Sequence, residues 1–211
     1  MSRNNLVIYG AGGLGREILC LARLLGRWNI LGFTDDSLAA GTRVAGLPVL
    51  GREELLSLGK PLDVVIGFAD PEGKARTAER LKKIPGLNFP VLIAPDAYVE
   101  QDAVLEQGCV VGHFCFVSTG ARLGEFTFLN TAVQIGHDSQ TGACCSFMPM
   151  SDISGHVSVG EKTLFGAQSF VLQGLNVGSR SVVGAGSRVF RNVPDNVTVF
   201  GTPAQIIRKN S

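Results

Sequence analysis

His137 has the surroundings best suited to chemistry among the three histidines of this sequence. Its neighbour Asp138 is an acid that can orient the imidazole ring and raise its basicity, as a general base requires. The repeat described below puts His137 outward beside a turn, with His156 next to it and His113 on another face. The alternative interpretation of His137, a bystander histidine at the surface, stays open at this point.

A glycine-rich run, Gly10–Gly15, is the second candidate. It follows an apolar segment typical of a strand and precedes helical spacing, which is the context that gives such a run meaning. Its glycines let the backbone approach a phosphate, and the helix N-terminus offers free N–H groups. Asp35 and Asp36 follow the next expected strand, where an acid can bind a ribose hydroxyl. A turn that only packs helix on strand remains the alternative.

The elements around these motifs predict a small α/β unit with a parallel sheet. Strands are expected over 6–9, 30–34 and 63–67, and helices over 16–25, 53–58 and 71–84. Gly67 and Phe68 then end at the same sheet edge as the two acids. The unit is too short for a complete dinucleotide fold, which needs two mononucleotide halves.

A hexapeptide period organises the rest of the chain. Seventeen positions six residues apart hold an aliphatic residue or Phe in every case but Thr141, and they are Ile93, Val99, Leu105, Val111, Val117, Leu123, Leu129, Ile135, Thr141, Phe147, Ile153, Val159, Phe165, Val171, Val177, Val183 and Val189. Small residues, Cys109, Cys115 and Cys145 among them, follow four positions later. Glycine often follows the large residue directly, and we expect it to supply unusual backbone angles.

This period predicts a parallel β-helix with about 18 residues in each three-sided coil. The large and the small residues both point inward, so those three cysteines serve core packing. A segment over 197–200 can add one last strand, and the tail then caps the open end of the solenoid. We therefore expect two domains, residues 1–92 and residues 93–211.

Composition excludes several classes of function. The 211 residues carry a net charge of +1, so no charge pattern favours nucleic acid or an acidic membrane. No apolar run approaches about 20 residues, and the N-terminus lacks a signal-peptide pattern. The five cysteines include no CxxC pair, which argues against a zinc cage or a redox dithiol. A reduced, cytoplasmic protein without a metal site is expected.

The chain resembles the hexapeptide-repeat sugar acetyltransferases that carry an N-terminal nucleotide-sugar domain. These include the sialic acid O-acetyltransferase-like family and the nucleotide 4-amino-sugar N-acetyltransferases of the bacillosamine or perosamine type. The resemblance covers the whole chain and rests on the runs Gly10–Gly15, 33–36, 130–138, 153–160, 183–186 and 200–204. It implies a Rossmann-like α/β domain, a left-handed β-helix and a homotrimer.

The resemblance also implies roles for single residues. His137 is the general base, Asp138 raises its basicity, and acetyl-CoA is the co-substrate, bound in a groove between neighbouring solenoids. The residues that match the cofactor and nucleotide-sugar positions of the family are Ser146, Gly155, Ala167 and Ala185 for the cofactor and Gly12, Gly13, Leu14, Asp35, Asp36, Gly67 and Phe68 for the nucleotide sugar. Ser146 stands where some members have a second histidine, so it offers only a hydroxyl.

The expected reaction is direct transfer of acetyl to the amino group of a nucleotide-linked 4-amino sugar, an EC 2.3.1 activity. The alternatives are O-acetylation of a sugar such as sialic acid, and a non-catalytic trimer that binds nucleotide sugars. An NAD-dependent oxidoreductase is disfavoured by the short α/β part. Cys144, expected to point outward, is a further but weaker candidate as an acyl carrier.

Overall fold

The computed structural model describes residues 3–59 and 61–210 and divides them between two compact units. The first comprises Met1–Ala69 and Arg76–Leu92, and the second comprises Asp70–Ala75 and Ile93–Ser211. Residues 70–75 therefore belong with the second unit, whereas the expected boundary at residue 92 places them in the first. None of the described helices is long and apolar enough to span a lipid bilayer.

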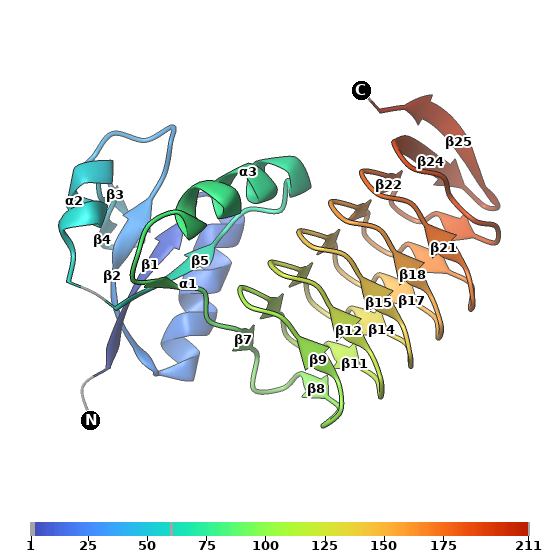
Figure 1. Cartoon of the computed structure of the whole chain (residues 1–211), viewed down its shortest axis with the longest axis horizontal. Helices are drawn as coiled ribbons and strands as arrows, with labels where there is room; N and C mark the ends of the chain where they lie inside the picture. The colour runs from blue at the N-terminus through green and yellow to red at the C-terminus, as the bar shows by residue number, and fades with distance from the viewer. Residues whose placement is uncertain (1–2, 60, 211) are drawn as a thin grey trace. The chain divides into compact units, whose positions relative to one another are not determined.

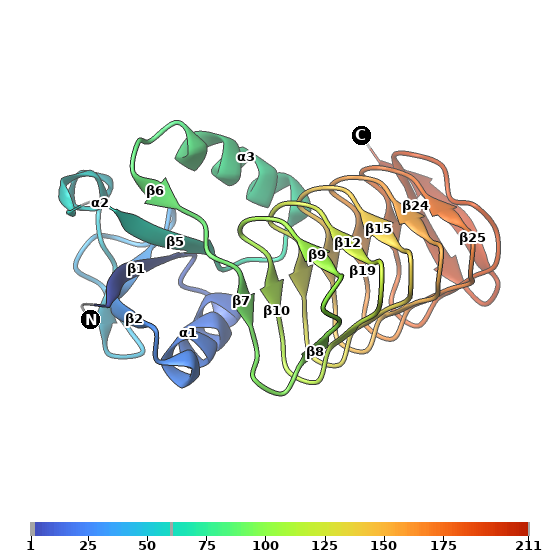
Figure 2. The same ribbon diagram turned by 60° about the horizontal axis from the view of Figure 1, so that its bottom comes forward.

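The first unit contains the expected parallel sheet, with strand order β2-β1-β5-β6 (Figures 1 and 2). Its elements are β1 (Asn4–Tyr9), α1 (Gly13–Leu25), β2 (Trp28–Thr34), β3 (Arg43–Val44), β4 (Leu47–Pro48), α2 (Arg52–Ser57), β5 (Leu62–Ile66) and β6 (Leu87–Asn88). Helix α3 (Pro71–Lys82) is divided between the units, because its residues up to Ala75 belong to the second. The last four residues of β1, Leu6 to Tyr9, are buried on both faces, as the central strand of a parallel sheet requires. Helix α1 packs against β1 and β2.

The second unit is a parallel β-helix built from three sheets of short strands, seen as stacked coils in Figures 1 and 2. One sheet contains β7 (Leu92–Ile93), β10 (Val110–Val111), β13 (Phe128–Leu129), β16 (Ser146–Phe147), β19 (Leu164–Phe165), β22 (Val182–Val183), β24 (Val197–Gly201) and β25 (Ala204–Lys209). The second contains β8 (Tyr98–Val99), β11 (Phe116–Val117), β14 (Gln134–Ile135), β17 (Asp152–Ile153), β20 (Phe170–Val171) and β23 (Arg188–Val189). The third contains β9 (Val104–Leu105), β12 (Arg122–Leu123), β15 (Gln140–Thr141), β18 (Ser158–Val159) and β21 (Asn176–Val177).

The predicted coil length and the inward stacking are confirmed. Each strand pairs with the strand three repeats further along, as Val111 pairs with Leu129. All fourteen large positions from Val111 to Val189 are buried, and Phe147 stacks on Phe165 with ring centroids 4.6 Å apart. Thr141, the one polar exception, is buried too. Its hydroxyl lies 3.3 Å from that of Thr127 inside the coil, which gives the buried group a hydrogen-bond partner.

The small inward residues have a polar task in addition to fitting a narrow space. Ser139 donates its hydroxyl to the carbonyl of Ser154 at 2.8 Å, and Thr163 donates to Gly178 at 2.9 Å. Both acceptors lie in the next coil along the chain. These bonds satisfy buried carbonyl groups between adjacent coils, which explains why Ser and Thr recur at positions where Ala would also fit.

The glycines that follow the large residues serve close packing, and the expectation that they supply unusual backbone angles is wrong. A Cβ atom on Gly136 would lie 2.5 Å from the backbone nitrogen of Gly155 in the next coil. Backbone angles of the left-handed region occur two residues later instead, at the turns between strands. At most of these turns the residue that adopts them is not glycine, as at Asp138 with φ 58°.

Candidate functional site

His137 and Asp138 form a close pair at one corner of the β-helix, directly after β14. The imidazole Nδ1 lies 2.9 Å from a carboxylate oxygen of Asp138, and the two side chains are 45% and 53% exposed. When Nδ1 carries the proton and donates it to Asp138, the other ring nitrogen, Nε2, is left as an acceptor. The pair therefore has the arrangement of a general base with an orienting acid.

Glycines in the adjacent coils leave space for this pair. A Cβ atom on Gly155 would lie 2.6 Å from Cε1 of His137, and one on Gly120 would lie 2.6 Å from Oδ1 of Asp138. Gly155 occupies the equivalent position to His137 in the following coil, and Gly120 the equivalent position to Asp138 in the preceding coil. Side chains at these two positions would displace the imidazole and the carboxylate, so the open corner depends on both glycines.

His156 joins the pair, whereas His113 does not. The rings of His137 and His156 are nearly perpendicular with centroids 4.8 Å apart, and Nε2 of His156 lies 3.7 Å from the same Asp138 oxygen. His113 pairs with Asp96 at a different corner, with Nδ1 and Oδ1 2.8 Å apart. Among the described residues, His137, Asp138 and His156 bring their ligand atoms within 4.8 Å of one another. The expectation of no metal stays a prediction.

The residues assigned to the cofactor lie at separate places on one chain. Gly155 lies beside His137, but Ala167 and Ala185 are stacked on a different corner, where the Gly186 N–H donates to the Ala167 carbonyl at 2.8 Å. A single β-helix does not bring that corner to His137. A site that uses both sets of residues therefore needs two chains.

Ser146, which is expected at the cofactor, is fully buried in this structure. Its hydroxyl accepts a hydrogen bond from Nζ of Lys74 at 2.7 Å, and the same ammonium donates to the Cys145 carbonyl at 2.8 Å. Burial lowers the pKa of Lys74 to about 8. In this structure Ser146 supports a buried lysine, and a ligand at the surface does not reach its hydroxyl.

The cysteines of the coils are packing residues. Cys144 was expected to point outward but is 4% exposed, so the structure does not support its use as an acyl carrier. Burial raises the pKa of Cys109 and Cys145 to about 12 and that of Cys115 to about 11. A thiol with such a pKa stays protonated near neutral pH and is a poor nucleophile.

In the first unit, all seven residues expected to bind the nucleotide sugar line one cavity of about 380 Å³. They are Gly12, Gly13, Leu14, Asp35, Asp36, Gly67 and Phe68. The N-cap of α1, Gly12, has an extended backbone and no side-chain cap, and the first turn of the helix carries no acidic residue. The helix therefore offers unpaired N–H groups and a positive dipole end to an anion.

Asp35 holds the glycine turn against the end of β2. One carboxylate oxygen accepts the Ala11 N–H at 2.8 Å, and the other accepts the N–H and the hydroxyl of Ser37. Partial burial works to raise the pKa of Asp35, but these hydrogen bonds outweigh it and the pKa falls below its usual value. Asp35 therefore stays ionised and shapes the cavity.

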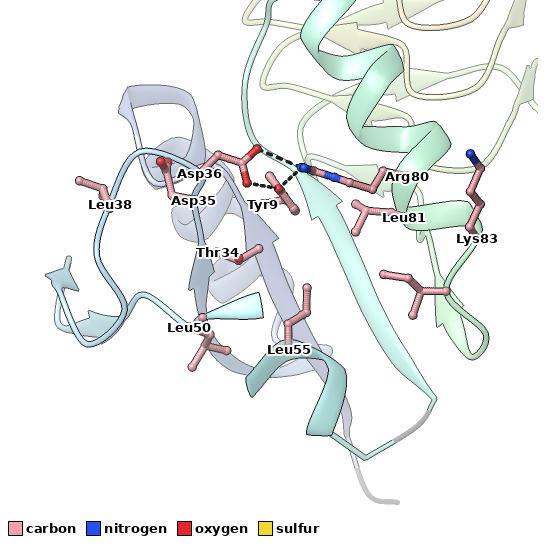
Figure 3. A pocket seen from close by; sticks show the side chains of 12 residues that line it. Tyr9, Thr34, Asp35, Asp36, Leu38, Leu50, Leu55, Arg80, Leu81 and Lys83 are labelled. Atoms are coloured by element: carbon pink, nitrogen blue, oxygen red, sulfur yellow. Dashed lines mark hydrogen bonds and ion pairs between the residues drawn. The ribbon is translucent and has the colours of Figure 1, made fainter. Parts of the chain in front are cut away.

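Asp36 links Tyr9 to Arg80 at the boundary of a second cavity, of about 500 Å³, shown in Figure 3. It accepts the Tyr9 hydroxyl at 2.5 Å and lies 2.9 Å from the Arg80 guanidinium, which also contacts the Tyr9 hydroxyl. Burial, with the Asp36 hydrogen bond second, raises the pKa of Tyr9 to about 12. The hydrogen bond from Tyr9, followed by Arg80, lowers the pKa of Asp36.

Sequence reasoning missed Tyr9, Arg80, Ser37 and Lys74. Tyr9 had a visible signal, because it is the polar end of β1 immediately before the glycine turn. Arg80 and Lys74 had none, since a helix rich in Lys and Arg is ordinarily a solvated surface element. Only the structure shows that one of these cations pairs with Asp36 and that the other is buried.

Comparison with known proteins matches both units to recognised families. Residues 5–81 match the PglD N-terminal domain, and residues 156–191 match the hexapeptide repeat of succinyl-transferase. GDP-perosamine N-acetyltransferase from Escherichia coli O157:H7 is 28% identical over 96% of each chain.

Solved structures are similar over nearly the full length. The acetyltransferase domain of PglB from Neisseria gonorrhoeae FA1090 is 33% identical, with a TM-score of 0.90, over 97% of this chain and 100% of that chain. A complex of that domain with acetyl coenzyme A gives 31% identity, a TM-score of 0.89 and coverage of 98% and 100%. A His-to-Asn mutant of perosamine N-acetyltransferase from Caulobacter crescentus, in complex with CoA and GDP-perosamine, is 27% identical with a TM-score of 0.89 over 98% of each chain.

Proposed function

The chain belongs to the PglD/PerB-type hexapeptide-repeat nucleotide-sugar N-acetyltransferases, and we propose that it transfers acetyl from acetyl-CoA to the amino group of a nucleotide-linked amino sugar, with His137 as the general base. The observation that carries this proposal is the His137–Asp138 pair at an open corner of the β-helix. The structural relatives that bind CoA or acetyl-CoA support the choice of donor.

The chemistry follows from the free Nε2 of His137. The sugar amine attacks the thioester carbonyl, a C–N bond forms and the C–S bond breaks. His137 takes the proton that the amine loses, and the proton then passes to the departing thiolate of CoA. Asp138 holds the Nδ1–H and stabilises the imidazolium formed on the way. No covalent enzyme intermediate is needed, in keeping with the buried thiols.

The cavity at the N-terminus of α1 is the proposed nucleotide-sugar site. Its glycines lack side chains that would block a diphosphate, and nothing lies within 4 Å of a Cβ added to Gly12 or Gly13. The unpaired N–H groups of the first helical turn suit phosphate oxygens. Relatives in complex with GDP-perosamine support a nucleotide-linked acceptor, while the identity of the sugar and base belongs to the proposal.

A homotrimer with sites between subunits is part of the proposal. It is supported by the separation of the His137 corner from the corner of Ala167 and Ala185, which one chain does not bring together. Co-expression of His137→Ala with Ala185→Trp tests it. If each site takes one corner from each of two subunits, random mixing restores about a quarter of the sites. No recovery in isolated mixed trimers would place all site residues on one subunit.

A cytoplasmic location is also proposed. All five cysteines are free thiols in the structure, and four of them are buried in the coils. Disulfides are rare in that compartment because thiols there are kept reduced.

The test of the function is release of free CoA thiol. The purified protein is mixed with acetyl-CoA and a panel of UDP-, GDP- and TDP-linked 4-amino sugars, with free sialic acid as the O-acceptor control. We expect thiol release with at least one amino sugar and none with sialic acid. Release with sialic acid alone would instead establish O-acetylation. Nucleotide binding without any thiol release would favour a non-catalytic binding protein.

A further inference from the structure

His156 has no part in the mechanism above, yet it lies against both members of the His137–Asp138 pair. Its ring meets the His137 ring edge to face at 4.8 Å, and its Nε2 lies 3.7 Å from the Asp138 oxygen that His137 also contacts. Its backbone N–H donates to the His137 carbonyl at 2.8 Å, which fixes the spacing of the two residues. One carboxylate oxygen therefore faces two imidazoles.

Few other ionisable groups lie near this corner in the β-helix. The equivalent corner positions in the coils on either side are Thr119, Gly120, Gln173 and Gly174. Asp102 and Arg191 lie one coil further out at the two ends. Asp152, half-buried on β17, and Arg122, exposed on β12, lie on the flanking strands. His137 and His156 are thus the main ionisable groups that face the Asp138 carboxylate.

We propose that His156 is a positioning residue for the base: it holds the His137 ring edge-on and shares the Asp138 carboxylate with it. This inference rests on the proposed function, because it assigns His156 a task only if His137 is the base. His156 contacts the orienting acid and the side of the base, so it acts through His137 rather than on the substrate.

His156→Asn is the variant that tests this. Asparagine tolerates the left-handed backbone of this position, φ 56°, so the coil should fold normally. We expect kcat to fall about tenfold with KM for both substrates unchanged, short of the roughly 100-fold that a 1 Å misplacement can cost. His113→Asn, which removes the histidine of the His113–Asp96 pair elsewhere on the solenoid, is the matched control and should change neither quantity.

A second measurement works without an acceptor and so separates this inference from the function. NMR signals of the His137 ring are compared at one pH in the wild type and in both variants. His156→Asn but not His113→Asn should shift the Nδ1 signal of His137, which reports its hydrogen bond to Asp138. An unchanged Nδ1 signal in His156→Asn overturns the inference. An active wild type with equal kcat in all three proteins does so too, and neither result bears on His137 as the base.

Discussion

His137 lies directly over Gly155 in the next coil, so that the edge of the imidazole ring occupies the space where a side chain at residue 155 would stand. Gly155 is buried and has ordinary backbone angles. Its lack of a side chain is therefore needed for the position of the neighbouring histidine and not for the path of the chain.

Gly155→Ala should consequently impair catalysis more than stability. The added methyl group would push the His137 ring away from Asp138, and a displacement near 1 Å can cost about 100-fold in rate. We expect kcat to fall by about that factor, while the thermal unfolding midpoint changes little. Thiol release and circular dichroism measure the two quantities. Ser154→Ala, one residue earlier, is the control, and equal losses in both variants would contradict the role given to Gly155.

Asp36→Asn should weaken nucleotide binding. The carboxylate is the common partner of Tyr9 and Arg80 at the wall of the cavity, and a hydrogen bond to a charged group contributes about 1.5–3 kcal/mol. We expect the Kd for UDP or GDP, measured by calorimetry, to rise roughly tenfold or more. Glu79→Gln removes the same charge from the exposed face of α3 and should leave Kd unchanged. Equal Kd values for wild type and Asp36→Asn would remove Asp36 from the site.

Lys74 should make stability depend on pH in the alkaline range. Its pKa is lowered from 10.5 to about 8 in the folded chain, chiefly by burial. Between these values the unfolded chain binds more protons than the folded one, so the free energy of unfolding rises with pH. The burial penalty is fully present below pH 8 and amounts to about 3 kcal/mol.

Urea unfolding at pH 7.5 and pH 10 checks this expectation. Between pH 7.5 and pH 10 the free energy of unfolding of the wild type should rise relative to that of Lys74→Met, because the variant lacks the titrating group. The difference between the two proteins removes opposing contributions, such as that of Tyr9, whose raised pKa of about 12 costs stability as pH rises above 10. Lys209→Met at the exposed C-terminal strand should behave like the wild type. A constant difference between wild type and Lys74→Met would refute the buried, perturbed lysine.

The sequence predicts the β-helix well because every coil repeats the same packing problem. Each large residue from Val111 to Val189 meets its copy in the adjacent coil, so one register determines them all. The same register correctly put His156 beside His137. The parallel sheet of the first unit was also predictable, from three apolar strands and one glycine turn.

Contacts between residues far apart in sequence could not be predicted in this way. Lys74 reaches Ser146 across 72 positions, and Arg80 reaches Asp36 across 44. Neither pairing leaves a periodic signal, because each involves a single side chain on a helix whose composition is typical of a solvated surface. The burial of Ser146 against Lys74 and the Tyr9–Asp36–Arg80 contacts therefore cannot be predicted from the sequence.

The most direct test of the account compares wild type with His137→Ala in thiol release at saturating acetyl-CoA and amino sugar. Acetyl-CoA affinity and oligomeric mass are measured in parallel on both proteins. Loss of a general base lowers the rate by roughly 100- to 10,000-fold, and we predict a loss in that range with affinity and mass preserved. A His137→Ala protein that releases CoA at the wild-type rate would contradict the assignment of the base.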